Sequence, residues 1–219
     1  MNRIREAKLD ASGDHEDILP WTFWQLDAGG QRQVDGGVVM EEPLEIRLDG
    51  RAVAVLMRTP GMEKELAAGF LLSEGWLASH KEIALVRHCG GPLPGDRPDN
   101  PDEDALTGSR NVVETTSTAP DATARPSALG DVVQLIRSGC GRTGGSVLAA
   151  NLSHVDAEVW VDRQVLPHLV AQITRRQEAY RAAGGIHAAA VFDASGVALV
   201  VAEDIGRHYA MDKALGHCL

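Results

Sequence analysis

A glycine-rich stretch with one thiol is the clearest candidate for chemistry in this sequence. Residues 138–145 are Ser-Gly-Cys-Gly-Arg-Thr-Gly-Gly, so four glycines surround Cys140. Glycine adopts positive φ readily, and we therefore predict a mobile loop that brings this thiol close to another molecule. The cation of Arg142 and the N–H groups of a glycine-rich turn would favour the reactive thiolate. The alternative is that Cys140, like many free cysteines, is a small buried apolar residue.

A second group of polar side chains gathers between residues 187 and 213. Its members are His187, Asp204, Arg207, His208, Asp212 and Lys213. Together they could line an anion or nucleotide pocket, since a guanidinium such as that of Arg207 suits phosphate. Alternatively, Asp204 caps the following helix while Asp212 and Lys213 are solvated surface charges. The residues alone leave both interpretations open.

Composition excludes several function classes. The net charge of −10 argues against nucleic acid or an anionic membrane as the main partner. No apolar run approaches the roughly 18 residues that a membrane span requires. The three cysteines are odd in number and widely spaced, which favours a reducing compartment. Because residues 1–10 also lack the apolar core of a signal peptide, we expect a cytoplasmic protein.

The elements that must position these residues begin after a polar leader, residues 1–33, which we expect to be poorly ordered. Alternation over 44–48 and 53–57 around Asp49-Gly50 predicts a β-hairpin. Thr59 before Pro60 is typical of a helix N-cap, and that helix should end near Ser73. The spacing of Ser79 and Glu82 predicts a short turn of helix before a strand over 83–88.

The rest of this β-rich region contains two long segments without periodicity. Residues 90–110 and 116–130 are predicted loops, with an edge strand over 111–115 between them. The apolar run 131–137 leads to the cysteine loop, and its sequence does not decide between helix and strand.

The second half of the chain shows alternating helix and strand patterns. A strand is predicted over 157–161, followed by one helix from Leu166 to Tyr180 with its C-cap at Gly184. Apolar runs over 187–193 and 197–202, joined by a Ser195-Gly196 turn, predict two paired strands. A last helix should cover Ala210–Leu215.

Three segments in order along the chain resemble the FdhD family. They are Glu42-Pro43-Leu44-Glu45-Ile46, the run from Ala67 to Gly75 (Ala-Ala-Gly-Phe-Leu-Leu-Ser-Glu-Gly), and the run from Gly184 to Gly216. The resemblance implies a mixed α+β and α/β fold. A small β-rich N-terminal domain (34–137) and the cysteine loop (138–145) would precede a cytidine-deaminase-like α/β/α domain (146–219), incomplete at its C-terminus.

The resemblance also implies a task. Members of this family look like sulfurtransferases that take persulfide sulfur from a cysteine desulfurase and pass it to the molybdenum bis(guanine dinucleotide) cofactor of formate dehydrogenase. The family's essential cysteine falls on Cys140, and His187, Asp204, Arg207 and His208 become candidates for the cofactor face. A non-catalytic chaperone that binds the cofactor or the dehydrogenase, or an inactive truncated relative, is the alternative.

Several features depart from the family pattern. Thr143 replaces a second cysteine, which removes a thiol that could attack a persulfide, and Tyr209 replaces an asparagine. The family pattern continues beyond Gly216, so an uncovered sheet edge would favour association, including a homodimer. A deaminase-like fold suggests zinc, but Ala188 and Ala189 follow His187 where a glutamate would be needed, and there is no Cys-x-x-Cys. We therefore expect no zinc site.

Overall fold

The computed structural model describes residues 17–89, 111–119, 134–136 and 160–219. Its largest unit is a five-stranded sheet. In spatial order the strands are β5 (Ile83–Cys89), β6 (Val112–Ser117), β3 (Glu42–Leu48), β4 (Arg51–Arg58) and β7 (Gln134–Ile136). A 3-10 turn, His80–Glu82, precedes β5 as predicted.

The predicted β-hairpin is confirmed as β3 and β4. The turn residues Asp49 and Gly50 both have positive φ, 49° and 78°, as a tight two-residue hairpin turn requires. Alternate side chains of β3 are fully buried and form the centre of the main core with Leu56 and Phe70. The period-2 pattern therefore determines which face of this sheet is covered.

Strand β6 is an interior strand, and the prediction of an edge strand over 111–115 was wrong. It pairs parallel to β3, with Glu45 opposite Val112, and antiparallel to β5, with Cys89 opposite Val112. Its pattern is short and polar, with Glu114 and three hydroxyl side chains, so the sequence did not reveal that Val113 and Thr115 are fully buried. The apolar run before the cysteine loop supplies β7, which lies parallel to β4.

Helices α1 (Glu63–Ser73) and α6 (Arg207–His217) pack against each other. A Cβ added to Gly69 would lie 2.0 Å from the Asp212 carbonyl oxygen, and one added to Gly216 would lie 1.9 Å from that of Glu65. These reciprocal contacts show that the helices run in opposite directions with their backbones touching. Only glycine allows such an approach.

The start of α1 differs from the prediction. The helix begins at Glu63 and not at Pro60, and Met62, with φ of 58°, lies at its N-cap position. Thr59 caps nothing locally, because its Oγ1 accepts a hydrogen bond from the Ile205 N–H at 3.0 Å. The hydroxyl of Thr59 thus bonds to a residue 146 positions away and not to the start of the helix. The predicted end of α1 at Ser73 is confirmed.

The second sheet consists of β8 (His187–Phe192) and β9 (Ala198–Asp204), as predicted. Two helices, α4 (Leu166–Arg176) and α5 (Glu178–Ala183), replace the single predicted helix and are divided at Gln177. Arg181 donates to the Thr174 and Arg175 carbonyls, while Glu203 accepts from the Ala179 and Tyr180 N–H groups. These side chains bind the unpaired carbonyl groups at the end of α4 and the unpaired N–H groups at the start of α5. The spacing of apolar residues, from which the single helix was predicted, contains no information about such contacts. Trp160 and Val161 are not in a strand.

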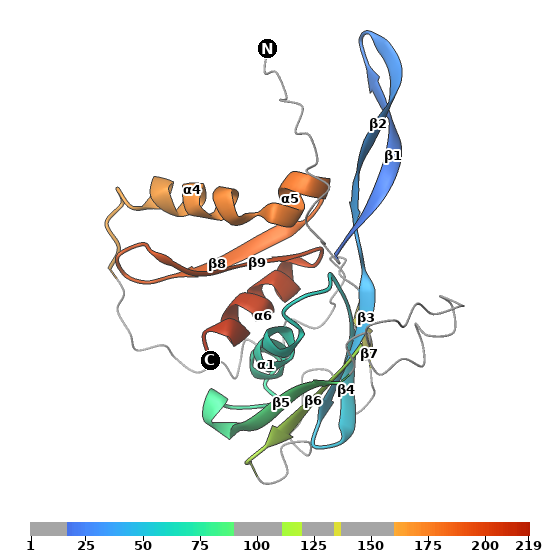
Figure 1. The fold of residues 1–219 in the computed structure, drawn as a ribbon. Coiled ribbons are helices and arrows are strands. Elements are labelled where there is room, and N and C mark those ends of the chain that lie inside the picture. The colour runs from blue at the N-terminus through green and yellow to red at the C-terminus, as the bar shows by residue number, and fades with distance from the viewer. Residues whose placement is uncertain (1–16, 90–110, 120–133, 137–159) are drawn as a thin grey trace, which may run out of the picture.

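The predicted polar leader contains a regular ribbon. Strands β1 (Ile18–Asp27) and β2 (Gly30–Val39) pair antiparallel over ten residues each. The sequence prediction of a leader through residue 33 was therefore wrong from Ile18 onward, because cross-strand pairing orders a stretch in which many side chains stay exposed. The ribbon projects away from the other elements (Figure 1).

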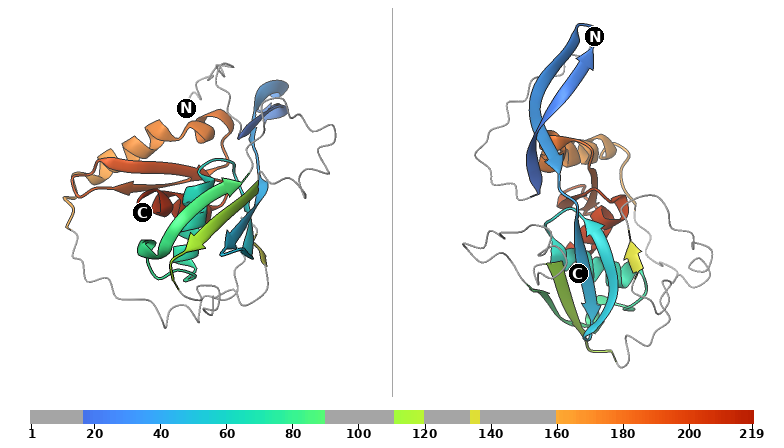
Figure 2. Two further views of the ribbon diagram at one scale, coloured as in Figure 1. Left: turned by 60° about the horizontal axis from the view of Figure 1, so that its bottom comes forward. Right: turned by 90° about the vertical axis from the view of Figure 1, so that its right-hand side faces the viewer.

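The elements stack in layers (Figures 1 and 2). Helices α1 and α6 lie between the five-stranded sheet and β8–β9, and α4 and α5 cover the other face of β8–β9. Tyr209 of α6 belongs to the main core, 4% exposed, so the last helix packs on the N-terminal sheet as well. The fold is a mixed α/β arrangement of several sheets, and the predicted domain boundary at 138–145 lies outside the described residues.

Candidate functional site

One end of the five-stranded sheet holds a buried arginine between two carboxylates. The register places the first residue of β3, Glu42, opposite the last residue of β4, Arg58. Strands β5 and β7 end there too, and Asn111 directly precedes β6 at the same end. This end of the sheet, which we call the charged edge, faces α1 and the start of α6.

Arg58 is the centre of the charged edge. It is 2% exposed, and its Nη2 donates to Asn111 Oδ1 at 2.9 Å and lies 3.3 Å from Glu63 Oε1. Glu42 Oε2 lies 3.7 Å from its Nη1. Sequence reasoning missed Arg58, although it continues the inward alternation of Ala54 and Leu56 along β4. That alternation was the available signal.

The Glu63 carboxylate is held ionised by its surroundings. Burial alone would raise its pKa, but the Gly61 N–H, which donates at 2.6 Å, and the Arg58 charge outweigh burial and keep the pKa below 4.5. This carboxylate therefore stabilises the fold at neutral pH, and the contribution is lost as the pH falls through the lowered pKa.

Glu63→Gln should lower the free energy of unfolding by about 1.5–3 kcal/mol at pH 7, because it removes a charge-assisted contact to a buried guanidinium. The difference between the wild type and this variant should shrink between pH 5 and pH 3. Urea unfolding at each pH measures both values. Glu65→Gln is the matched control, because Glu65 lies in the same helical turn two residues further on and has no ion pair with Arg58. A gap that does not depend on pH would contradict the assignment.

A second buried pair joins α6 to the loop between β4 and α1. Lys213 Nζ lies 2.8 Å from Asp204 Oδ2 and donates to the Thr59 and Glu203 carbonyls at 2.8 and 3.1 Å. Asp204 also accepts from the Thr59 and Gly206 N–H groups at 3.2 and 2.8 Å. Asp204 is 0% exposed and Lys213 is 1% exposed. The pair therefore links the end of β9, α6 and the loop after β4.

Burial dominates the titration of this pair. It raises the pKa of Asp204 and lowers that of Lys213, while their mutual attraction opposes both shifts. The alternative sequence interpretation was wrong on both counts: Asp204 accepts from the N–H of Gly206, the N-cap residue of α6, but no side chain caps the helix, and Asp212 and Lys213 are buried and not solvated. Asp212 accepts a hydrogen bond from Ser73 Oγ at 2.8 Å across the two helices.

The four sequence candidates for a cofactor face lie close together but point to different environments. His187 begins β8 and pairs with Asp204 at the end of β9, and Arg207 and His208 are the first two residues of α6. His187, Arg207 and His208 are exposed, whereas Asp204 is fully buried. Three of the four can therefore meet a ligand from solvent.

Cys140, Arg142 and Thr143 lie outside the described residues. The last described residue before them is Ile136, which pairs with Leu56 near the charged edge. Of the other cysteines, Cys89 is half-buried at the end of β5 and Cys218 is exposed.

Two further kinds of feature are absent from the described residues. No group of three or more His, Cys, Asp or Glu side chains there could hold a metal ion. No helix in the same residues is long and apolar enough to cross a membrane.

Comparison with known proteins gives consistent matches. The Sulfur carrier protein FdhD of Mycolicibacterium paratuberculosis is 39% identical over 192 residues, which cover 83% of this chain and 64% of that protein. The protein of the same name from Nocardia farcinica is 33% identical over 200 residues, covering 89% and 66%. This chain thus spans slightly less than two thirds of the length of these relatives.

A solved structure shares the fold. A crystal structure described as a formate dehydrogenase accessory protein from Desulfotalea psychrophila superposes with a TM-score of 0.66 over 91% of this chain and 68% of the other, at 18% identity. At that identity the likeness shows the fold alone. The sequence itself matches the FdhD/NarQ family over residues 39–219, from the end of the β1–β2 ribbon onward, and the chain belongs to that family.

Proposed function

We propose that this chain is a sulfur carrier of the sulfurtransferase type. It takes a persulfide sulfur onto Cys140 from a cysteine desulfurase, and passes it to the molybdenum bis(guanine dinucleotide) cofactor before that cofactor enters formate dehydrogenase. The observation that carries the proposal is the family match over residues 39–219, with relatives named sulfur carriers and with one glycine-flanked cysteine inside the matched region.

The first step is a thiol exchange. The Cys140 thiolate attacks the outer sulfur of the donor persulfide, the donor S–S bond breaks, and the desulfurase cysteine leaves as a thiolate. In the second step the S–S bond on Cys140 breaks, Cys140 leaves as a thiolate, and the metal of the acceptor supplies the two electrons that turn the transferred sulfur into a sulfide ligand. Cys140 ends as it began, as a carrier must.

The exposed group at the start of α6 is the proposed face for the acceptor. Arg207 and His208 lie at a helix N-terminus, where N–H groups and the helix dipole favour anions such as the phosphates of a guanine dinucleotide. The side chain of Asp204 is withdrawn into its pair with Lys213, so we assign it to positioning α6 and not to contact with the cofactor.

We also infer that residues 160–219 are part of a cytidine-deaminase-like α/β/α unit without zinc. The support is the layering of β8–β9, which carries α4 and α5 on one face and α6 on the other. We propose that the protein acts in the cytoplasm.

The test is intact-mass spectrometry after incubation with a cysteine desulfurase and cysteine. We expect a gain of about one sulfur atom that a reductant removes, and near-complete loss of this gain in Cys140→Ala. Cys89→Ala and Cys218→Ala are matched controls and should load normally. Loading on Cys89 or Cys218, or none in a folded protein, would refute Cys140 as the carrier and favour the binding chaperone.

A further inference from the structure

Strand β5 has an open edge beside helix α1 (Figure 1). Among the described strands it is the outermost of its sheet, because β6 pairs with it on one side only. The N–H and C=O groups along its other side therefore meet no strand in the part of the chain that the structure describes. An edge of this kind is the surface to which an extended peptide can add as a further strand.

A hollow of about 360 Å³ lies along this edge, on the face of the sheet that α1 covers. Its apolar lining comes from Ala68 of α1, Ile83 and Val86 of β5, Gly216 of α6, and Leu219. The volume is at the lower end of the roughly 300–1,000 Å³ that is usual for ligand pockets. A strand added to β5 would direct every second side chain to this face of the sheet, so the hollow lies where those side chains would go.

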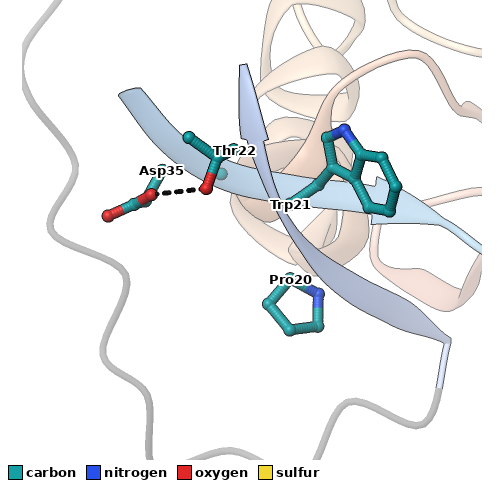
Figure 3. A pocket seen from close by; sticks show the side chains of 5 residues that line it. Pro20, Trp21, Thr22 and Asp35 are labelled. Carbon is teal, nitrogen blue, oxygen red and sulfur yellow. Dashed lines mark hydrogen bonds between the residues drawn. The ribbon is translucent and has the colours of Figure 1, made fainter. Parts of the chain in front are cut away.

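A second hollow, on the β1–β2 ribbon, offers a ligand less. No helix contributes to its lining, and the carboxylate of Asp35 already accepts a hydrogen bond from Thr22 Oγ1 at 3.0 Å (Figure 3). Its lining residues are Pro20, Trp21, Thr22, Asp35 and Gly36. Of the two hollows, only the one beside β5 combines a strand edge with a helix.

The polar side chains around the β5 hollow are mostly basic. Lys64 and His80 line it, and Lys81, the next residue in sequence, is exposed. Among the described residues of the lining, Glu65 is the only acid. The nearby carboxylate of Glu82 accepts a hydrogen bond from a backbone N–H of the preceding turn at 2.9 Å. In a chain with a net charge of −10, this local excess of basic side chains favours an acidic partner.

We propose that the groove between α1 and β5 binds an extended, acidic segment of a partner polypeptide. The segment adds to β5 as a further strand and places its apolar side chains in the hollow. Backbone hydrogen bonds to β5 supply affinity, and the hollow selects the side chains. A second copy of this chain is a poorer occupant, because pairing of two β5 edges would bring two sets of basic side chains together. The proposal does not depend on Cys140.

Linear peptides of about ten residues, displayed on phage and selected against the full chain, test the proposal. We expect enriched sequences in which apolar residues alternate with others and acids outnumber bases. The most enriched peptide is then made with a fluorescent label, and its binding is measured by fluorescence anisotropy. Backbone N–H groups of alternate residues point to the same side of a strand. N-methylation of one alternate set should therefore weaken binding about tenfold or more, and N-methylation of the other set should not.

Charge reversal at the groove provides a second readout. Lys64→Glu should weaken binding of the selected peptide about fivefold or more, and should strengthen binding of a version in which lysine replaces the acids. Arg163→Glu is the matched control, because Arg163 is also exposed, changes the net charge equally, and precedes α4 on the far side of β8–β9. This variant should change the dissociation constant less than about twofold. Circular dichroism checks that both variants fold.

Three results would overturn the proposal. They are the absence of any enriched peptide, equal effects of Lys64→Glu and Arg163→Glu, and binding that tolerates N-methylation of both alternate sets. A groove that another segment of the same chain already fills would give the first of these results. Sulfur loading of the wild type reports on the carrier role alone, so failure of either proposal can be told apart from failure of the other.

Discussion

Lys213→Met should lower the free energy of unfolding by about 3–5 kcal/mol, because it leaves the Asp204 carboxylate buried without its counter-charge. The variant also loses two hydrogen bonds, so the Thr59 and Glu203 carbonyls lose their cationic donor. Urea unfolding at pH 7 followed by circular dichroism measures the loss. Lys64→Met, which removes an exposed lysine from α1, should change stability by less than about 0.5 kcal/mol.

The pH dependence of the Lys213→Met variant provides an independent check. Without Lys213, burial raises the pKa of Asp204 above its usual 3.8. The part of the destabilisation that comes from the unpaired charge is therefore absent below pH 3.8, grows as the pH rises from 3.8 to the raised pKa, and is constant above it. The gap to the wild type should therefore be larger at pH 8 than at pH 5. The double variant Asp204→Asn/Lys213→Met should recover most of the stability, and its failure to do so would argue against a charge effect.

Gly69→Ala should destabilise the protein by about 1–3 kcal/mol or more, the opposite of what helix propensity alone predicts. Alanine gains about 1 kcal/mol over glycine in a free helix. Here its Cβ would lie 2.0 Å from the Asp212 carbonyl oxygen, so α1 and α6 must separate and their contacts with the core must loosen. Thermal unfolding should show a fall of roughly 2–4 °C per kcal/mol lost.

The control for Gly69→Ala is Met211→Ala in α6, since Met211 is 61% exposed and next to Asp212 in sequence. It should leave the melting temperature nearly unchanged. An unchanged or raised melting temperature for Gly69→Ala would show that the two helices do not pack with their backbones in contact.

Local sequence patterns predicted the elements whose own residues determine them. The β3–β4 hairpin follows from the Asp49-Gly50 turn and the alternation beside it, and β8 and β9 follow from two apolar runs around a turn. The errors concern long-range partners. Thr59 has the local pattern of a helix cap but bonds to Ile205, and β6 has the pattern of an edge strand but pairs on both sides.

In the candidate site, too, local sequence identified candidate residues but not their long-range surroundings. Cys140 was found from its glycine neighbours and stays a prediction, because it lies outside the described residues. His187, Arg207 and His208 lie near the start of α6 and stay predictions for a cofactor face. The burial of Asp204, Asp212 and Lys213 could not be derived from their type, since charged residues are mostly exposed. Tyr209 was noted only as a departure, and the structure places its ring in the core against Gly206.

The antiparallel contact of α1 with α6 has a consequence for synthesis. During translation the hairpin, α1 and β5 leave the ribosome long before Tyr209 and Gly216, yet these two residues cover part of the same core. The first half of the nascent chain must therefore wait with apolar surface exposed until more than 200 residues have been made. In the cell, this chain should depend on early capture by a holding chaperone more than a protein whose first module closes on itself.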